Sequence, residues 1–436
     1  MDSSTRSILS ELLSYSVSKE QKLYIVGGTL RDILSLKPCT DFDLTGKNAA
    51  ELASSFAHAS SHTCVLLDNT PGRKTVRVIL HKNQHLDVTD LQGENIETDL
   101  SQRDFTINAM GQELSDFLSK GKNILDPYAG QKDLKNCKIR VLEGPIFQSD
   151  PVRILRAFRF AATLGFAIET TTLEKIALYK SHLTKPAQER VWHELSLFLK
   201  TPNTLPLLKV MHDCGVLTCL FPHDNDIQGE LFDPYQNLET ILADPEKFFP
   251  DFSQAFNDSL ANHYLLKFAV LLNRSEQNDS ADITTLAQKW KLRASNAEIN
   301  TIQHAIKGAR YLSGIHSKEG HTATPPELYE WVQNIQEELL AAVILFVSRT
   351  QNAIPFCQHI LKFYYQHYLP AMNEKPLING NDLIQQFSLT PSPLFGKILD
   401  QTQKAQVLGT ITSQKEALEL AEAFIKHPLP NQNHDK

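Results

Sequence analysis

The sequence lacks any apolar run long enough to cross a bilayer. The longest clean one, LLAAVILFV at residues 339–347, is far shorter than the roughly 20 residues that a spanning helix needs. The first twenty residues, MDSSTRSILSELLSYSVSKE, are polar and mixed in charge, so we expect no signal peptide. These absences argue against a membrane protein and a secreted one, and they predict a cytoplasmic location.

Cysteine is also scarce. The chain has six cysteines in 436 residues, and Cys214 and Cys219 are too far apart for the usual zinc-knuckle spacing. The sixteen histidines form no set with metal-ligand spacing. We therefore expect reduced thiols, as in the cytosol, rather than a disulfide framework or a zinc site.

The chain has no excess of positive charge. Its net charge of -7 argues against a protein that coats nucleic acid indiscriminately. The charge is nevertheless segregated, because residues 222–234 are acidic while one earlier interval is basic. The basic residues of that interval are Lys132, Lys135, Lys138, Arg140, Arg153, Arg156 and Arg159. A local positive surface is therefore expected.

The hydrophobic pattern changes near residue 150. Before about residue 144, β-like runs such as KLYIV and KTVRVIL alternate with helical stretches such as NAAELASSFAHA. From Asp150 onward, apolar residues recur almost wholly at helical spacing. The pattern predicts an α+β protein, with a mixed sheet and helices first and a long all-α part after it. The C-terminal KHPLPNQNHDK is expected to be disordered.

A glycine pair ends the first predicted strand, in KLYIVGGTLRDILSL. Gly27 and Gly28 allow a sharp turn and expose backbone N–H groups at the start of a helix, which favours phosphate binding. Arg31 would add a charge-assisted fork. The alternative is an ordinary joint between a strand and a helix.

Two aspartates follow on the next predicted strand. Asp41 and Asp43 alternate with apolar residues and therefore share one face, and paired carboxylates suit Mg²⁺ with substrate phosphates. Asp87, in HLDVTDL, completes a carboxylate set for phosphoryl transfer if its strand lies beside theirs. The alternative is a solvated strand end with unrelated acids.

Four motifs in this order resemble the signature series of class II tRNA nucleotidyltransferases, the CCA-adding enzymes, and of bacterial poly(A) polymerases. They are VGGTLRDILSLKPCTDFDL, RDFTINAM, DPVRILRAFRFAATLGF and AQERVWHELSLFLK. The resemblance implies a polymerase-β-like nucleotidyltransferase head at 1–144, followed by all-α parts. These are a neck for base recognition at 145–222, an RNA-binding body at 223–370 and a tail at 371–436.

The resemblance also implies roles for single residues. Gly28 and Arg31 match positions that hold the triphosphate, and Asp41 and Asp43 match the metal pair that activates the 3′-hydroxyl of an RNA primer. Arg103 matches a phosphate or ribose contact. The implied partners are CTP, ATP and the acceptor and TΨC arms of tRNA, and the implied cofactor is Mg²⁺. The sequence does not indicate an oligomeric state.

The helix that opens at Asp150 carries the implied base recognition. Asp150 and Arg153 match a protein template, in which the carboxylate accepts from the exocyclic amine of cytosine or adenine and the guanidinium donates to the ring edge. Arg156 and Arg159 continue the same face and are grouped with the nucleotide-binding residues. The plain alternatives are an N-cap at Asp150 and a solvated basic face. For Asp104 and Asn108 in RDFTINAM, the alternative is a structural turn.

The chain departs from the family pattern in two places. Ser149 replaces the usual Glu before Asp150, which leaves base selection open to different tuning. Only a short segment separates Asp87 from Arg103, where family members that add the complete CCA carry a longer flexible loop. The short segment favours a partial activity, such as adding only the two cytidines.

The helical part after the four motifs is less informative. Glu189, Arg190 and Glu194 match a neck helix, with i,i+4 surface pairing as the alternative. The stretch LKFAVLLNRSEQND shows no His-Asp pair, so we expect no phosphohydrolase activity of the kind that some relatives carry. The rival functions are a poly(A) polymerase, a catalytically silent RNA-binding relative, and transfer of a nucleotide to a small molecule or protein.

Overall fold

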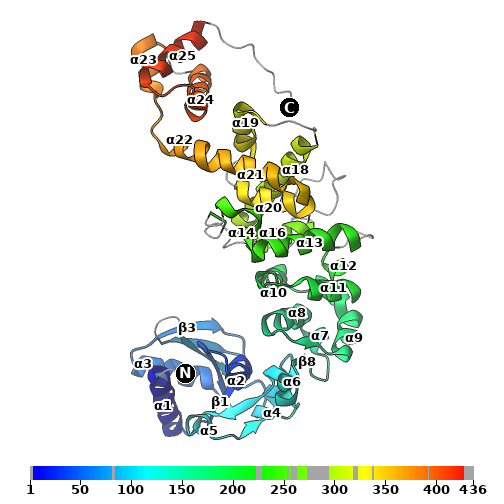
Figure 1. Cartoon of the computed structure of the whole chain (residues 1–436). Helices are drawn as coiled ribbons and strands as arrows, with labels where there is room; N and C mark the ends of the chain where they lie inside the picture. Colours follow the sequence, from blue (N-terminus) through cyan, green and yellow to red (C-terminus); the bar gives the residue numbers. More distant parts are fainter. Residues whose placement is uncertain are drawn as a thin grey trace. The chain divides into compact units, whose positions relative to one another are not determined.

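The computed structural model describes residues 3–80, 84–221, 228–252, 255–256, 263–272, 294–317, 323–335, 338–390 and 392–426. These divide into two compact units, one before and one after residue 225 (Figure 1). The first unit holds the strands and the second is helical, so the predicted α+β class is confirmed. The predicted boundary at 222/223 lies outside the described residues.

A mixed sheet forms the centre of the first unit, as predicted. Its spatial order is β3-β4-β5-β2-β1-β6-β7. Strand β2 pairs in parallel with β5, and the other neighbours pair antiparallel. The strands are β1 (Leu23–Val26), β2 (Asp41–Gly46), β3 (Thr63–Asp68), β4 (Thr75–Ile79), β5 (His85–Asp90), β6 (Gly111–Glu113) and β7 (Ile124–Leu125).

One face of this sheet is apolar because side chains alternate along each strand. Phe42 and Leu44 on β2 are buried with Leu86 and Val88 on β5, in one core that also contains residues of helices α1 (Ser3–Ser18) and α3 (Ala49–Ala59). Burying each of these side chains contributes about 1.5–3 kcal/mol. The opposite face therefore carries the alternate, polar residues of β2 and β5.

The other helices of the first unit alternate with its strands along the chain, and after β9 only helices and 3-10 turns follow in its described part. A two-stranded parallel ladder of β8 (Lys138–Ile139) and β9 (Ala167–Ile168) joins the two sides of the predicted boundary at 144/145. The helices are α2 (Gly27–Leu34), α4 (Ile96–Ser101), α5 (Leu114–Leu118), α6 (Gly130–Lys135), α7 (Ile146–Ser149), α8 (Arg153–Leu164), α9 (Thr170–Tyr179), α10 (Gln188–Lys200), α11 (Leu205–Asp213) and α12 (Val216–Leu220), with 3-10 turns η1 (Thr106–Asn108) and η2 (Lys180–Thr184).

One helix boundary differs from the prediction. Helix α8 begins at Arg153 with Val152 in the N-cap position, rather than after an N-cap at Asp150. Residues 151 and 152 form a turn, closed by the 3.1 Å bond from Arg153 N to the Asp150 carbonyl, and the Asp150 side chain accepts from Arg190 instead of capping the helix. Further along, Gly215 has a φ of +75°, which a helix cannot accommodate, and it separates α11 from α12.

The described part of the second unit is helical, as predicted. Helices α18 and α20 pack against one another at its centre, and α20 also packs on α13. The elements are α13 (Gln228–Ala243), α14 (Pro245–Phe248), η3 (Pro250–Phe252), α16 (His263–Leu272), α18 (Asn296–His316), α19 (Pro325–Ile335), α20 (Leu339–Arg349), η6 (Gln351–Ala353), α21 (Ile354–Phe363), the π-helix η7 (Tyr364–Tyr368), α22 (Leu369–Asn373), α23 (Gly380–Phe387), α24 (Pro393–Val407) and α25 (Gln414–Lys426).

The apolar run at 339–347 lies in α20, a packed helix of the second unit. In the described ranges, no helix combines the length and the apolarity that a membrane span requires. The predicted disordered end, residues 427–436, and part of the stretch searched for a His-Asp pair, residues 273–279, lie outside the described residues.

Candidate active site

A polar cavity of about 780 Å³ opens between the polar face of the sheet and helices α8 and α10. Its wall is built from the β1–α2 turn, β2, the β3–β4 loop, the segment around α4, and both of those helices. The predicted residues on the wall are Gly27, Gly28, Arg31, Asp43, Arg103, Asp150, Arg153 and Arg156. Asp41, Asp87 and Arg159 are not among the described residues that line it.

The glycine pair makes room for two charged groups. Gly27 has a φ of +64°, and a Cβ on it would lie 2.9 Å from Arg103 Nη1 and 3.4 Å from Asp43 Oδ2. A Cβ on Gly28 would also lie 3.4 Å from Asp43 Oδ2. Larger residues would therefore crowd the carboxylate and the guanidinium. This cradle has the dimensions and the charges to receive a phosphate together with a cation.

Asp43 is the buried acid of this cradle. Its strand register places it beside Asp87, on the neighbouring parallel strand. Burial raises the pKa of Asp43 above its usual value and the charge of Asp87 adds to the rise, while the charge of Arg103 opposes it. A carboxylate that is desolvated next to another carboxylate is stabilised by a cation. The site therefore fits a divalent metal ion.

The other two predicted acids lie on the same face of the sheet as Asp43 and have neighbours of their own. Asp87 accepts two hydrogen bonds of 2.7 Å from Arg77, on the adjacent strand β4. Asp41 is largely exposed, and one of its oxygens lies 3.4 Å from His85 Nδ1. Within the described ranges, no group of three or more His, Cys, Asp or Glu side chains is arranged for a metal ion. The strand of Asp87 does lie beside that of Asp41 and Asp43, which was the condition for a shared carboxylate set.

The Asp150 carboxylate has one satisfied and one unsatisfied oxygen. Its Oδ2 accepts a 2.7 Å hydrogen bond from Arg190 and lies 3.8 Å from Arg153 Nε. Its Oδ1 is buried and has no hydrogen-bond partner within the described part of the chain. An unpaired buried acceptor costs about 1–3 kcal/mol, so this carboxylate has unused hydrogen-bond acceptor capacity.

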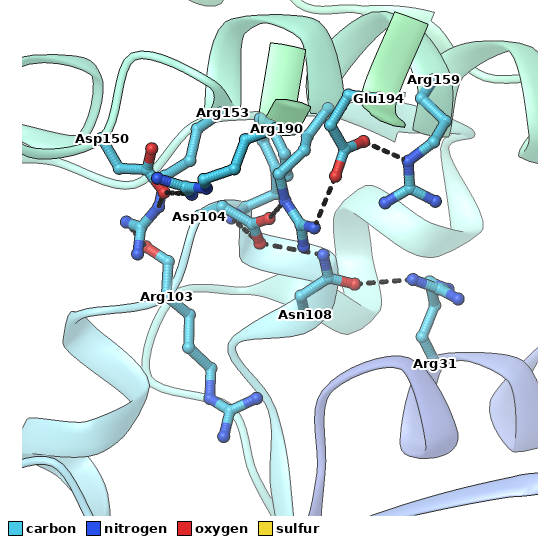
Figure 2. A network of polar contacts seen from close by, with 11 residues as sticks. Arg31, Arg103, Asp104, Asn108, Asp150, Arg153, Arg159, Arg190 and Glu194 are labelled. Atoms are coloured by element: carbon cyan, nitrogen blue, oxygen red, sulfur yellow. Dashed lines mark hydrogen bonds and ion pairs between the residues drawn. The ribbon is translucent and has the colours of Figure 1, made fainter. Parts of the chain in front are cut away.

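Asn108 and Asp104 connect Arg31 of α2 with the arginine-bearing helices above it (Figure 2). Arg31 Nη1 donates to Asn108 Oδ1 at 2.8 Å, and Asn108 Nδ2 donates to Asp104 Oδ1 at 2.9 Å. Asp104 also accepts a 2.8 Å bond from Arg156 Nε. Both side chains are held by hydrogen bonds within the protein, and both also line the cavity.

Glu194 continues this network on α10. It accepts from Arg156 at 3.1 Å and from Arg159 at 2.5 Å, and all three side chains appear in one connected cluster. Burial raises the pKa of Asp104, but Arg156 and the hydrogen bond from Asn108 outweigh it, so the net pKa is lowered. Asp104 is therefore held ionised beside Arg156.

Three predicted nucleotide-binding arginines are thus engaged by the protein itself. Arg156 and Arg159 do not form a solvated basic face, because their guanidinium groups are paired with buried acids. The Arg31 fork is taken by Asp32, with distances of 2.9 and 3.0 Å. These contacts leave fewer donors for a ligand than the sequence suggested.

The neck residues pair across helices rather than along α10. Arg190 binds Asp150, and Glu194 binds Arg156 and Arg159, so the i,i+4 interpretation is wrong for both of them. Glu189 lines the cavity as well. Ser149, where the family pattern has Glu, donates to the Ile146 carbonyl at 3.1 Å and only closes the turn of α7.

Asp99 and Arg73 are charged wall residues that were missed from the sequence. Asp99 accepts from Arg103 at 2.9 and 3.1 Å, a pairing that the i,i+4 spacing of the two residues could have indicated. Arg73 lies on the β3–β4 loop, where the Pro-Gly turn signal marks a loop but not its direction.

Three family models match the chain. They describe a poly A polymerase head domain at residues 23–140, an RNA and SrmB binding site of polymerase A at residues 165–226, and tRNA nucleotidyltransferase domain 2 at residues 266–421. The head model thus contains the glycine cradle and the aspartates of β2.

Relatives and a solved structure match over nearly the whole chain. A CC-adding tRNA nucleotidyltransferase of Geobacter sulfurreducens is 26% identical, over 93% of this chain and 93% of the relative. An A-adding tRNA nucleotidyltransferase of Deinococcus radiodurans is also 26% identical, over 90% of this chain and 93% of the relative. The Thermotoga maritima CCA-adding enzyme complexed with tRNA is 25% identical, with a TM-score of 0.73 over 98% of this chain and 96% of that one.

Proposed function

Because the chain belongs to the class II tRNA nucleotidyltransferase and poly(A) polymerase family, we propose that it adds CMP, AMP or both to the 3′ end of tRNA. The substrates are CTP and ATP, and the second product is pyrophosphate. No nucleic-acid template is needed. We assign this activity to the cytoplasm.

One observation carries the proposal. The glycine cradle beside Asp43 and the unsatisfied Asp150 Oδ1 belong to residues of the same cavity wall. The cradle therefore suits phosphates and a cation, and the Asp150 carboxylate on the same wall can accept a hydrogen bond from a ligand. A nucleoside triphosphate carries both kinds of group. The arrangement supports binding of the triphosphate at the cradle and of the base at Asp150.

Base selection follows from the polarity of Asp150 and Arg153. The carboxylate accepts a hydrogen bond from the exocyclic amine of cytosine or adenine, and the guanidinium donates to the ring edge. Uracil and guanine place a carbonyl oxygen where the amine would be, so two acceptors would face each other. This mismatch costs about 1–3 kcal/mol or more. Arg190 holds the carboxylate by its other oxygen.

At the other end, Gly27, Gly28 and Arg103 bind and orient the triphosphate. Asp43, together with Asp41, would hold Mg²⁺, which supplies positive charge to the reacting phosphate and to the 3′-hydroxyl of the RNA. The partial desolvation of Asp43 strengthens the interaction of its carboxylate with a cation. Asp87 contributes negative charge beside it, although Arg77 moderates that charge.

We assign tRNA as the RNA partner. The helical residues after the head, which form the predicted neck, body and tail, would bind its acceptor and TΨC arms. Double-stranded RNA is recognised mainly by shape and by phosphate contacts. Long helical surfaces can supply both. We also propose that this division of labour follows the predicted domain boundaries at 144/145 and 370/371.

A partial activity is favoured over full CCA addition. The segment between Asp87 and Arg103 contains only the end of β5, one turn and the short helix α4, which Asn95 caps by accepting from Thr98 N at 2.9 Å. This segment is short and folded, whereas the family members that add the complete CCA carry a longer flexible loop there. We therefore favour addition of the two cytidines, with polyadenylation as the alternative.

The direct experiment supplies purified protein and Mg²⁺ with tRNA transcripts that end before CCA, after C, or after CC. CTP and ATP are given separately and together, and product lengths are read on a sequencing gel. Two added nucleotides with CTP alone would identify CC addition, and one added nucleotide with ATP on the CC-ending transcript would identify A addition. Long tails from ATP would identify a poly(A) polymerase. If no transcript is extended under any condition, the proposed function is wrong.

A further inference from the structure

The loop between β3 and β4 presents Arg73 on a fixed turn. Arg73 N donates to the Thr70 carbonyl at 2.9 Å across Pro71 and Gly72, and Gly72 has a φ of +74°. Proline followed by a residue with positive φ is the pattern of a type II turn. Asp68 also accepts from the Thr70 backbone and hydroxyl, at 2.9 and 2.6 Å. Backbone contacts therefore hold the loop without the Arg73 side chain.

Most arginines on the cavity wall already have a close carboxylate. The shortest nitrogen–oxygen distances are 2.9 Å for Arg31, 2.9 Å for Arg103, 2.8 Å for Arg156 and 2.7 Å for Arg190. Arg73 differs from them, because its Nε lies 3.7 Å from an Asp68 oxygen and its side chain is 63% exposed. Such a long, solvent-screened pair is weak.

Arg153 is the other wall arginine with a distant carboxylate, at 3.8 Å from Asp150. It projects from α8, whereas Arg73 comes from the sheet loop, and both line the same cavity. Burial lowers the pKa of Arg153. The negative charges of Asp104 and Asp150 raise this pKa, and the positive charge of Arg73 lowers it. Two guanidinium groups that repel each other across a cavity are both stabilised when an anion enters it.

We propose that Arg73 is a further substrate-binding residue, which contacts a phosphate group of the ligand that enters this cavity. The proposal rests on the proposed function, because it assumes that the ligand is a nucleotide or an RNA end. A phosphate of the incoming triphosphate and a phosphodiester near the RNA 3′ end offer the same oxygens. The guanidinium fork suits either source through charge-assisted hydrogen bonds.

The test compares Arg73→Ala and Arg73→Gln with Arg73→Lys and with a control, Lys74→Ala. Lys74 is the neighbouring cation on the same loop but is not among the residues that line the cavity. Dissociation constants are measured separately for CTP and for a tRNA transcript lacking CCA, without turnover. We expect the Ala and Gln variants to bind one of the two ligands at least about 5-fold more weakly, because one charge-assisted hydrogen bond is removed. The Lys variant should recover part of this affinity.

The ligand whose affinity falls in the Ala and Gln variants is the one that supplies the phosphate. If it is the tRNA, the slope of log Kd against log salt concentration also falls by about one, which a purely structural role of Arg73 would not change. Lys74→Ala is expected to change neither constant more than about 2-fold. Unchanged constants for both ligands in the Ala and Gln variants would overturn the proposal. The extension assay on the wild-type protein tests the proposed function independently.

Discussion

The two compact units bury different kinds of side chain. In the first, several charged side chains are buried, and each is paired with another polar or charged side chain; among the described residues these are Arg31, Asp99, Asp104, Asp133 and Glu194. All of them except Asp133 line the cavity. In the second, the described interior is almost wholly apolar, and its buried charges are Lys267 and Glu239, which form one ion pair at 2.6 Å.

This difference shows where the fold carries its binding chemistry. Buried charges lose hydration and stabilise a fold poorly compared with apolar packing. In the first unit they hold carboxylates and guanidinium groups in fixed positions beside an open cavity. In the second unit the pair connects α13 and α16 within a helical core. The predictions below test whether charge in the first unit serves substrates and charge in the second serves only packing.

The largest expected effect is on Asp43. Asp43→Asn should reduce nucleotide incorporation by more than about 10⁴-fold, or about 5 kcal/mol, because it removes charge that would hold the metal ion. Asp41→Asn is expected to act in the same direction. Affinity for tRNA should stay within about 2-fold, as measured by filter binding. Glu51→Gln, on the exposed side of α3, is the matched control, and retained turnover in Asp43→Asn would refute the metal role.

The second prediction concerns the buried pair of the other unit. Lys267→Met should reduce the free energy of unfolding by about 3–5 kcal/mol, because Glu239 stays buried without this cation. The double variant Lys267→Met/Glu239→Leu should recover most of that loss, which urea titration would measure. Incorporation per folded molecule should be unchanged in the double variant. A double variant that is stable but inactive would contradict the contrast between the units.

A smaller effect is expected for base selection. Asp150→Ala should reduce the preference for CTP over UTP by about 10- to 100-fold, equal to about 1–3 kcal/mol, because the acceptor for the exocyclic amine is lost. Ratios of kcat/KM for the two nucleotides would measure it. Glu143→Ala, an exposed acid before α7, is the control. Continued exclusion of UTP by Asp150→Ala would show that this carboxylate does not select the base.

The smallest expected effect concerns Asp104 and the pH dependence of stability. The pKa of Asp104 is lowered in the folded protein, since Arg156 and Asn108 outweigh the effect of burial. Its ionised form therefore stabilises the fold above the unfolded pKa of about 4. That stability is lost as the pH falls through the lower folded pKa. The difference in unfolding free energy between wild type and Asp104→Asn should shrink below pH 4. A difference that does not change with pH would contradict it.

Much of the head could be predicted from local patterns. The alternation in β2 placed Phe42 and Leu44 in the core, and the change of hydrophobic pattern near residue 150 separated a part with strands and helices from a helical part. Alternation also predicted that Asp41 and Asp43 share one face, whereas the place of Asp87 beside them depended on the pairing of β2 with β5, which the structure shows. These predictions succeed because side-chain direction in a strand depends on local geometry.

The partners of the arginines could not be predicted in this way. Helical spacing indicated that Arg153, Arg156 and Arg159 share a broad face, but it did not indicate that Glu194 would cover two of them. Glu194 lies 38 and 35 residues further along the chain, so the pairing depends on how α8 packs on α10. The direction of the Arg73 loop could not be predicted for the same reason, because it too depends on how separate elements pack.

By itself, the sequence determined the class of the fold, the family and the acids and glycines that its motifs contain. Strand alternation and helix periodicity follow from short-range geometry, which neighbouring residues specify. Only the tertiary structure decided which of the charged groups neutralise one another and which remain directed toward a ligand. That outcome depends on contacts between elements far apart in the chain, and on the desolvation that their packing imposes.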